Sequence, residues 1–355
     1  MSKKIRILYT IPNFKTAGSQ YVVLSLIAGI NKEKFNVYIG VEKYPELIPD
    51  LVPHENKIHF AREGNSINDI HNFAQLVKQH KIEIIHSWDY KSQFVEVLGS
   101  RLAGVKYLYT KKNAAWSKRW FLKSMLSSHI AYDNPEMEQA FFSSIVLKNK
   151  ISFIPHGVDT KLFRPLDSSK SSNNSKFNMC CIGNIGENKN QLFLIKALRN
   201  LPSDIYLNLY GRAETVYLKK LEKYIVELDL ENRVHFKGFV KNHELPRVLN
   251  EQDLFVLASK KEGLPVSILE ALACGVPVLT SDSGGGTRHI FKDRKGGEVF
   301  SIKDTLEFEE FVRKLFKSKQ TYNKKAKEAR DLILANYRLD KEIESYEKLY
   351  LNLKC

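Results

Sequence analysis

Residues 259–278, Ser-Lys-Lys-Glu-Gly-Leu-Pro-Val-Ser-Ile-Leu-Glu-Ala-Leu-Ala-Cys-Gly-Val-Pro-Val, place one glutamate in a loop and a second on the helix that follows. Pro265 suits a first helical turn because its missing N–H would be unpaired there. Apolar residues recur at helical spacing after it, and Gly275 ends the helix. Glu262 therefore lies just before the helix and Glu270 along it. The free N–H groups and positive dipole end of such a helix suit a phosphate or sugar oxygen, which indicates a nucleotide-sugar site.

Two apolar runs flank this stretch and place it within an α/β fold. Residues 253–258 before it and 277–281 after it both have the composition of buried strands. The order strand, loop, helix, strand puts Glu262 at the carboxyl end of a parallel strand, where open α/β sheets bind ligands. An exposed amphipathic helix is the alternative for the motif alone, and the flanking strands favour the binding site.

Strand and helix patterns alternate along the whole chain, which is typical of parallel sheets. The runs that we interpret as strands are 5–10, 35–40, 82–86, 107–110, 151–154, 177–183, 205–210, 234–236, 254–257 and 276–279. Helical patterns lie between them, for example at 67–80 and 92–103. The polar run 166–176 interrupts the alternation and is the predicted linker. We therefore expect one Rossmann-like domain at 1–165, a second at 177–338, and a final helix at 339–355.

The composition fits a two-domain chain without membrane spans. Its 355 residues exceed the usual size of one domain, and 43% of them are hydrophobic, which is enough for two cores. No run of about twenty apolar residues predicts a transmembrane helix, and the charged start does not resemble a signal peptide. The four cysteines lack metal-ligand spacing, so we expect a reduced, cytoplasmic protein.

The sequence E-G-L-P-V-S-I-L-E-A-L-A-C-G-V-P-V at 262–278 resembles the signature of the family 4 retaining glycosyltransferases, which have the GT-B fold. The resemblance covers most of the carboxyl half and, more weakly, the amino half. It implies two doubly wound Rossmann-like domains facing a cleft, an acceptor-binding one at 1–165 and a nucleotide-sugar-binding one at 177–338. The resemblance further implies that the C-terminal helix at 339–355 returns to the N-terminal domain. It also implies that Glu262 lies near the donor sugar, that Glu270 binds the ribose hydroxyls, and that Gly263, Leu264 and Pro265 belong to the donor-binding site.

Another glycine-containing loop of the carboxyl half is predicted to bind the donor. Gly183-Asn-Ile-Gly-Glu-Asn-Lys189 follows a strand and opens a helix. Its glycines let the backbone approach a ligand, and Lys189 can neutralise a diphosphate. Family members usually carry an arginine where this chain has Asn184. Arg212, which follows the next strand, is a candidate to replace that cation, and an exposed turn arginine is the alternative.

The resemblance extends to positions in both halves. Gly238 and Val240 match the segment whose backbone contacts the nucleotide base, and Gly18 matches a glycine loop near the donor phosphates. His86, at the end of a strand, is a candidate catalytic residue, with an ordinary hydrogen-bonded histidine as the alternative. Lys111 lies near where many relatives have a histidine and is a second candidate. A front-face route, in which the donor phosphate helps to deprotonate the acceptor, fits a protein that supplies positioning and charge.

The net charge of +15 suggests an anionic partner. Cations and indoles mix at 111–123, where Trp116 and Trp120 are four residues apart and would share one face of a helix. Such a segment suits an anionic membrane surface on the inner face of the cell membrane, and a solvated helix with packed indoles is the alternative. No fold signature for nucleic-acid binding accompanies the charge.

These observations predict a glycosyltransferase that moves a hexose or N-acetylhexosamine from a nucleotide-diphosphate sugar, with UDP preferred from family frequency. The expected acceptor is a saccharide or lipid-linked saccharide of a bacterial envelope polysaccharide. We expect no cofactor and no metal, since no Asp-x-Asp cluster stands at a strand end. The alternatives are another GT-B enzyme, such as a UDP-sugar epimerase, and a catalytically silent partner that binds nucleotide sugars.

Overall fold

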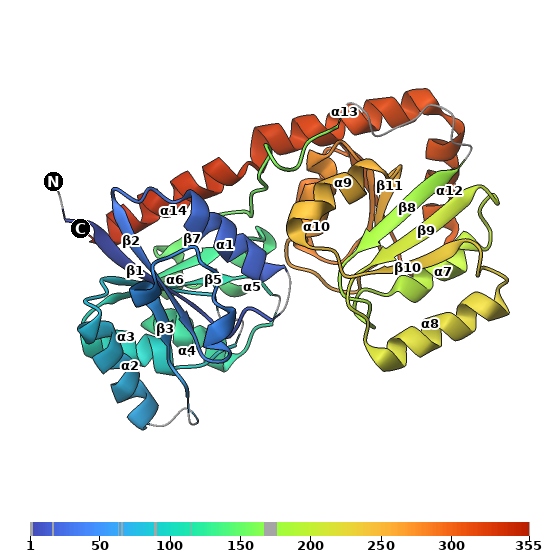
Figure 1. Ribbon diagram of the computed structural model, residues 1–355. Coiled ribbons are helices and arrows are strands. Elements are labelled where there is room, and N and C mark those ends of the chain that lie inside the picture. Colours follow the sequence, from blue (N-terminus) through green and yellow to red (C-terminus); the bar gives the residue numbers. More distant parts are fainter. Residues whose placement is uncertain are drawn as a thin grey trace. The chain divides into compact units, whose positions relative to one another are not determined.

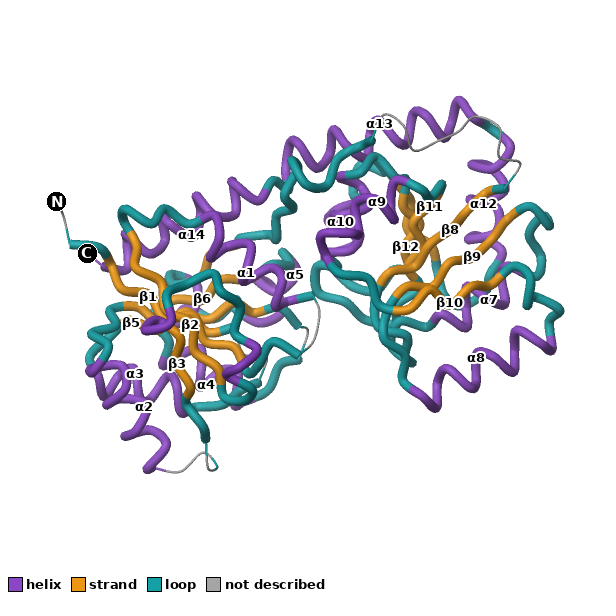
Figure 2. The backbone as a smooth tube through the Cα atoms, viewed as in Figure 1, coloured by secondary structure: helices purple, strands orange, loops and turns teal. Residues whose placement is uncertain are grey.

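The computed structural model describes residues 3–15, 18–62, 64, 67–88, 91–113, 115–166 and 176–354, without the side chains of Ser19 and Lys319. The chain forms two compact units, one of Met1–His156 with Leu339–Cys355 and one of Gly157–Arg338 (Figure 1). The tube in Figure 2 shows an inner layer of strands in each unit with helices around it. The predicted linker at 166–176 lies almost wholly outside the described residues.

The first unit has a parallel sheet of seven strands in its described part, in the order β3-β2-β1-β4-β5-β6-β7. These strands are β1 (Ile5–Ile11), β2 (Phe35–Val41), β3 (Lys57–His59), β4 (Ile84–Ser87), β5 (Lys106–Lys111), β6 (His129–Tyr132) and β7 (Ile151–Phe153). The central strands β1, β4 and β5 are buried over most of their length, as parallel strands covered on both faces must be. The order reverses between β1 and β4, which is the switch point of this sheet.

The helices of the first unit include the last helix of the chain. They are α1 (Ser19–Gly29), α2 (Ile67–Gln79), α3 (Val95–Ala103), α4 (Lys118–Leu126), α5 (Glu136–Phe141), α6 (Ile145–Lys148) and α14 (Leu339–Lys354), with 3₁₀ turns η1 (Pro45–Leu47) and η2 (His54–Asn56). Helix α14 packs on α1 and β4 and buries Tyr346 and Tyr350. A Cβ on Gly29 of α1 would lie 2.2 Å from the Cδ1 atom of Ile343, so the two helices approach closely here. The expected return of the last helix to the amino-terminal unit is confirmed.

The second unit has a parallel sheet with the order β10-β9-β8-β11-β12-β13. Its strands are β8 (Phe177–Ile182), β9 (Ile205–Tyr210), β10 (Val234–Gly238), β11 (Leu254–Leu257), β12 (Val278–Ser281) and β13 (Gly297–Phe300). Its helices are α7 (Gln191–Leu198), α8 (Thr215–Glu227), α9 (Leu245–Asn250), α10 (Val266–Ala273), α11 (Gly285–Ile290), α12 (Leu306–Lys317) and α13 (Lys319–Asn336), with the 3₁₀ turn η3 (Asn242–Glu244). The predicted pair of doubly wound sheets is confirmed.

The differences from the sequence-based elements are small and have simple causes. Strands β3, β6 and β13 were missed, because they have only three or four residues and carry polar side chains. Strand β12 begins at Val278 rather than at Val276. Helix α10 begins at Val266, so Pro265 is its N-cap with an extended ψ of 109° rather than a residue of the first turn.

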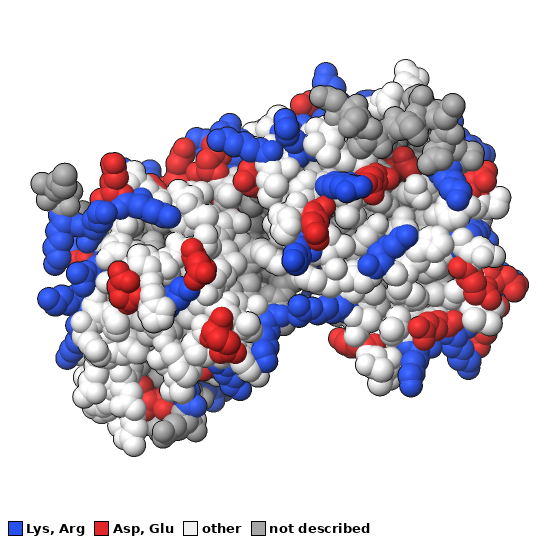
Figure 3. Space-filling view, in the orientation of Figure 1, with Lys and Arg blue, Asp and Glu red and all other residues white. Residues whose placement is uncertain are grey.

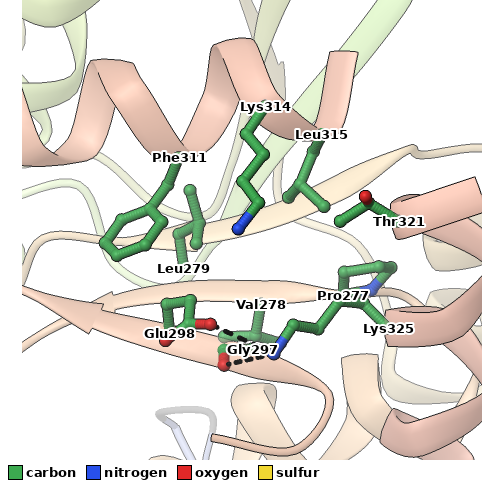
Figure 4. A pocket seen from close by; sticks show the side chains of 10 residues that line it. All are labelled: Pro277, Val278, Leu279, Gly297, Glu298, Phe311, Lys314, Leu315, Thr321 and Lys325. Atoms are coloured by element: carbon green, nitrogen blue, oxygen red, sulfur yellow. Dashed lines mark hydrogen bonds and ion pairs between the residues drawn. The ribbon is translucent and has the colours of Figure 1, made fainter. Parts of the chain in front are cut away.

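The amino ends of β12 and β13 are closed by the two helices that follow them. In Figure 4, Phe311 of α12 lies beside Leu279, Leu315 of α12 points toward the strands, and Lys325 of α13 reaches Gly297 and Glu298 at the start of β13. The Lys325 ammonium group lies 3.1 Å from the Glu298 carboxylate. The space between these side chains is about 20 Å³, which holds about one water molecule. This end of the sheet is therefore packed, and the opposite, carboxyl end is the place to look for ligands.

Two further observations concern the charge on the surface and the hydropathy of the helices. On the face in Figure 3, lysine and arginine side chains are spread over both units, with acidic side chains among them. None of the described helices is long and apolar enough to cross a membrane.

Candidate functional site

The candidate donor site lies at the carboxyl ends of the strands of the second unit. Strands β8 and β11 are neighbours there, but the chain continues to β9 on one side and to β12 on the other. Loops that leave such a switch point diverge and leave room for a ligand. The loop after β8 contains Lys189, and the loop after β11 contains Glu262. The sequence placed both residues at strand ends, and the topology makes these two ends neighbours.

Lys189 and Glu262 form an ion pair across the switch point, with 2.8 Å between Nζ and Oε1. Their side chains keep 21% and 16% exposure, so the pair is accessible from solvent. Backbone hydrogen bonds join the two loops, because the amide of Lys260 donates to the carbonyl of Asn188 at 2.8 Å. The Asn188 side chain in turn donates to the carbonyl of Lys261 at 3.0 Å. The cation and the carboxylate are thus held at a fixed place before any ligand arrives.

Glycines allow these loops to approach one another closely. A Cβ on Gly211 would lie 2.0 Å from the carbonyl oxygen of Gly183, and both residues have positive φ. A Cβ on Gly286, in the glycine-rich segment after β12, would lie 1.9 Å from the carbonyl oxygen of Gly263. Any side chain at these positions would displace the backbone around the ion pair, so the glycines shape the site by the space that they leave.

Two serines lie beside Glu262, and no sequence pattern pointed to either of them. The amide of Glu262 donates to the carbonyl of Ser283 at 2.8 Å. The buried hydroxyls of Ser283 and Ser259 have no hydrogen-bond partner among the described residues. Serine is common at strand ends, and nothing in the pattern around either residue distinguishes it.

Glu270 is buried on α10, and its side chain is 7% exposed. Burial raises the pKa of its carboxyl group from 4.5 to about 7, and the hydrogen bond from Asn242 partly opposes this shift. The Asn242 side-chain amide donates to Oε1 of Glu270 at 3.0 Å. Asn242 belongs to η3, and no motif pointed to it. A buried carboxylate next to an amide can accept hydrogen bonds from a diol.

The remaining predicted donor residues of the second unit lie beside these loops. Asn184 is exposed, and the amide of Ile185 next to it donates to the carbonyl of Arg212 at 2.8 Å. The Arg212 guanidinium lies 4.7 Å from the centre of the Phe239 ring. Arg212 therefore lies next to Asn184, the position at which the family usually has an arginine.

Four of the predicted site residues position the backbone of the loops and carry no charged group. Gly238 has a φ of 73°, and its carbonyl accepts from the amide of Gly211 at 2.8 Å. Val240 packs against the core of the second unit, and Leu264 and Pro265 are buried at the start of α10. These four residues place the loops, whereas Lys189, Glu262, Glu270 and Arg212 carry the charged groups.

His86 in the first unit does not have the surroundings of a catalytic residue. It is fully buried at β4, with Nδ1 2.6 Å from the Tyr350 hydroxyl and Nε2 2.7 Å from the Thr110 hydroxyl. Burial and then the charge of Lys112 hold its pKa well below 6.5. This is a neutral core histidine that ties α14 to the sheet, so the predicted catalytic role is corrected. Asp89, three residues further on, lies outside the described residues.

Lys111 requires the same correction. It is the last residue of β5, and its side chain is buried. Its ammonium group donates to the carbonyl of Asn113 at 2.6 Å and lies 4.2 Å from the centre of the Trp120 ring.

Gly18 is exposed at the N-cap of α1 with a φ of 84°, so its backbone conformation explains the glycine. Gly18 belongs to the first unit, whereas the other predicted donor-binding residues belong to the second.

The segment 111–123 does not form the exposed basic and aromatic face that we expected. Helix α4 begins at Lys118, so Trp116 precedes it, and its ring stacks on Phe141 at 4.9 Å. Trp120 is 4% exposed, and Lys123 is 1% exposed with its ammonium group 5.1 Å from the Trp120 ring. The prediction that Trp116 and Trp120 share one face of a helix is therefore wrong. Both indoles pack inward, and so do the side chains of Lys111 and Lys123. This segment gives no basis for a membrane-binding surface.

Comparisons with known proteins agree with the fold. Residues 164–332 match the family model for glycosyl transferases group 1. A UDP-Gal:alpha-D-GlcNAc-diphosphoundecaprenol alpha-1,3-galactosyltransferase from Escherichia coli is 24% identical over 307 residues, which cover 79% of this chain and 78% of that protein. A GDP-mannose-dependent alpha-(1-6)-phosphatidylinositol monomannoside mannosyltransferase from Mycobacterium tuberculosis is 25% identical over 251 residues, covering 62% of this chain and 64% of that one.

Solved structures share the whole fold. The structure of HepE from Anabaena in complex with UDP and glucose covers 98% of this chain and 100% of that chain, with a TM-score of 0.84 at 19% identity. Two doubly wound parallel sheets, one in each unit, are the GT-B fold. Residues 164–332 thus match the group 1 glycosyltransferase family, and the chain is related to glycosyltransferases of bacterial envelope and polysaccharide synthesis.

Proposed function

We propose that this enzyme transfers a hexose or N-acetylhexosamine from a UDP-sugar to a saccharide or lipid-linked saccharide of the bacterial envelope, with retention at the anomeric carbon. The observation that carries the proposal is the Lys189–Glu262 ion pair at the switch point. The names of the Escherichia coli relative and of the Anabaena complex support UDP. The mycobacterial relative is named for GDP-mannose, so the base is a point for direct measurement.

In this proposal the charged groups divide the donor between them. Lys189 leaves Glu262 and binds the diphosphate, and Arg212 adds a second cation in place of the arginine absent at Asn184. Glu262, released from Lys189, accepts hydrogen bonds from hydroxyls of the sugar. Glu270 accepts from the ribose hydroxyls in its ionised form. The donor thus exchanges one internal ion pair for two pairings with charged groups, which are about twice as strong as neutral hydrogen bonds.

The chemical step proposed for retention takes place on one face of the sugar. The bond between the anomeric carbon and the diphosphate oxygen breaks, and the acceptor hydroxyl oxygen bonds to the same carbon from the same side. Its proton passes to the departing phosphate oxygen, so UDP leaves carrying that proton. Lys189 and Arg212 stabilise the negative charge that grows on the diphosphate in the transition state. Such electrostatic stabilisation is usually the largest single contribution to the rate.

We also propose that transfer needs no divalent metal. Among the residues that the structure describes, no group of three or more His, Cys, Asp and Glu side chains could hold a metal ion. The charge of the diphosphate is then met by Lys189, Arg212 and the amides at the start of α10.

The test compares nucleotides before it looks for turnover. We expect UDP and UDP-sugars to raise the melting temperature of the full chain more than GDP or ADP compounds do, because a ligand of the native state stabilises it. Release of UDP from the preferred UDP-sugar, alone or with a lipid-linked saccharide, then measures turnover. Equal stabilisation by all nucleotides, or none, would refute the proposed donor.

A further inference from the structure

The first unit contains a pocket that the donor site does not use. It has a volume of about 220 Å³ and lies between the segment after β3 and the helices α2 and α3. Polar side chains in its wall are His59, Arg62, Asp69 and Asn72, and Phe60 and Phe73 add aromatic rings. The wall thus combines aromatic surface with converging polar groups, both of which small-molecule sites use.

Arg62 is the polar group that most needs an occupant. Its side chain is 7% exposed, and its Nη2 atom lies 2.5 Å from the Glu42 carboxylate and 3.0 Å from the Glu96 carboxylate. Its Nε and Nη1 atoms are buried and have no hydrogen-bond partner among the described residues. Buried donors in native proteins are nearly always paired, so two unpaired ones on a single guanidinium indicate acceptor oxygens that come from outside the chain.

The charge around Arg62 decides between an anionic and a neutral occupant. Glu42 and Glu96 both lie beside Arg62, and Asp69, a third carboxylate, is buried in the same wall. Asp69 accepts from the amide of Gly64 at 3.0 Å. A phosphate or carboxylate would bring a further negative charge beside these three carboxylates, and like charges repel one another most strongly away from water. A neutral molecule with several hydroxyl groups can accept from Arg62 and donate to carboxylates.

The apolar part of the wall suits one face of a sugar ring. The rings of Phe60 and Phe73 meet edge to face with 5.3 Å between their centres. The Arg62 guanidinium lies 5.6 Å from the centre of the Phe60 ring, so aromatic and polar surfaces adjoin. A cavity of about 150 Å³ in another protein holds benzene, so about 220 Å³ is enough for a six-membered ring with hydroxyl groups.

We infer that this pocket binds one neutral sugar residue of the acceptor glycan. The inference rests on the proposed function, because it assumes a saccharide acceptor. Arg62 then donates to two sugar oxygens, and Phe60 and Phe73 cover the C–H face of the ring. Asp69 in the wall and the exposed Asn72 at the mouth contact hydroxyls.

The experiment uses the full chain saturated with UDP, so that the donor site is occupied. Methyl α- and β-glycosides of glucose, galactose, mannose, rhamnose, N-acetylglucosamine and N-acetylgalactosamine are tested by saturation-transfer NMR. Asn72→Ala removes a pocket amide, and Gln75→Ala is the matched control, because Gln75 is also an exposed amide of α2 but does not line the pocket. Arg62→Lys keeps the charge beside Glu42 and Glu96 and removes the extra donors.

We expect at least one glycoside to bind with UDP present. Asn72→Ala should weaken its binding about fivefold, which corresponds to one hydrogen bond, and Arg62→Lys should weaken it further. Gln75→Ala should bind as the wild type does. The inference is overturned if no glycoside binds, if UDP displaces the glycoside, or if Asn72→Ala and Gln75→Ala behave alike. Failure of UDP to raise the melting temperature would instead refute the proposed donor site, and the two failures are therefore distinguishable.

Discussion

Glu270→Gln is the change that most directly tests how the buried carboxyl group works. Burial raises the pKa of Glu270 from 4.5 to about 7, so the folded protein holds this proton more tightly than the unfolded chain does. The stability that the neutral acid contributes is fully present below pH 4.5 and is lost as the pH rises through 7. A shift of this size corresponds to up to about 3 kcal/mol.

Glutamine resembles the neutral acid at every pH and can still accept the hydrogen bond from Asn242. At pH 8 and without nucleotide, we therefore expect Glu270→Gln to be more stable than the wild type by up to about 3 kcal/mol. At pH 4 the two proteins should be equally stable. Urea unfolding at both pH values measures the difference. If the wild type and Glu270→Gln have equal free energies of unfolding at pH 8, burial does not raise the pKa of the Glu270 carboxyl group.

The same substitution should remove the pH dependence of donor binding. If the ionised carboxylate accepts from the ribose, the wild-type Kd for a UDP-sugar should rise about tenfold from pH 8 to pH 6, where about one Glu270 in ten is ionised. Glu270→Gln should bind more weakly at pH 8 by about 1.5–3 kcal/mol and show no slope. A UDP-sugar is used rather than UDP, because a terminal phosphate titrates near pH 6 itself. An equal slope in both proteins would refute the role given to Glu270.

The other predictions concern the charged groups and glycines of the same site. Arg212→Gln should weaken UDP-sugar binding by about 1 kcal/mol or more, whereas Arg247→Gln, an exposed control on α9, should not; equal affinities would remove Arg212 from the diphosphate. Lys189→Met should weaken UDP binding, while Glu262→Gln should lower turnover more than UDP affinity, and calorimetry with UDP-release kinetics separates the two. Gly286→Ala should lower turnover by displacing the Glu262 loop, with unchanged circular dichroism; wild-type turnover would show that the loop adapts. Transfer should persist in EDTA, and a loss restored by magnesium or manganese would contradict the metal-free proposal.

Much of the fold follows from local patterns in the sequence. Apolar runs such as Leu254–Leu257 and the helical spacing after Pro265 identify strands and helices, because parallel strands buried on both faces are almost wholly apolar. Lys189 and Glu262 could be proposed together, since both follow strands of one sheet and such ends share an edge. Strands β3, β6 and β13 escaped detection, because three or four residues with polar side chains among them carry too little periodicity to distinguish them from loops.

Side-chain surroundings were the part that only the tertiary structure decided. His86 stands at a strand end as a catalytic residue would, but Tyr350 of the last helix, 264 residues further on, occupies one of its ring nitrogens. Trp120 and Lys123 follow the pattern of an exposed basic helix, yet both are buried.

The sequence by itself determined the alternation of elements, the glycines at the tight turns and the glutamates of the donor loop. Only the tertiary structure showed that Asn242 contacts Glu270 and that two N–H groups of Arg62 are unpaired in a pocket. The physical reason is that local spacing determines which face of an element is apolar. Which polar groups meet across that face depends on how distant elements pack, and this is not encoded in the spacing around any one residue.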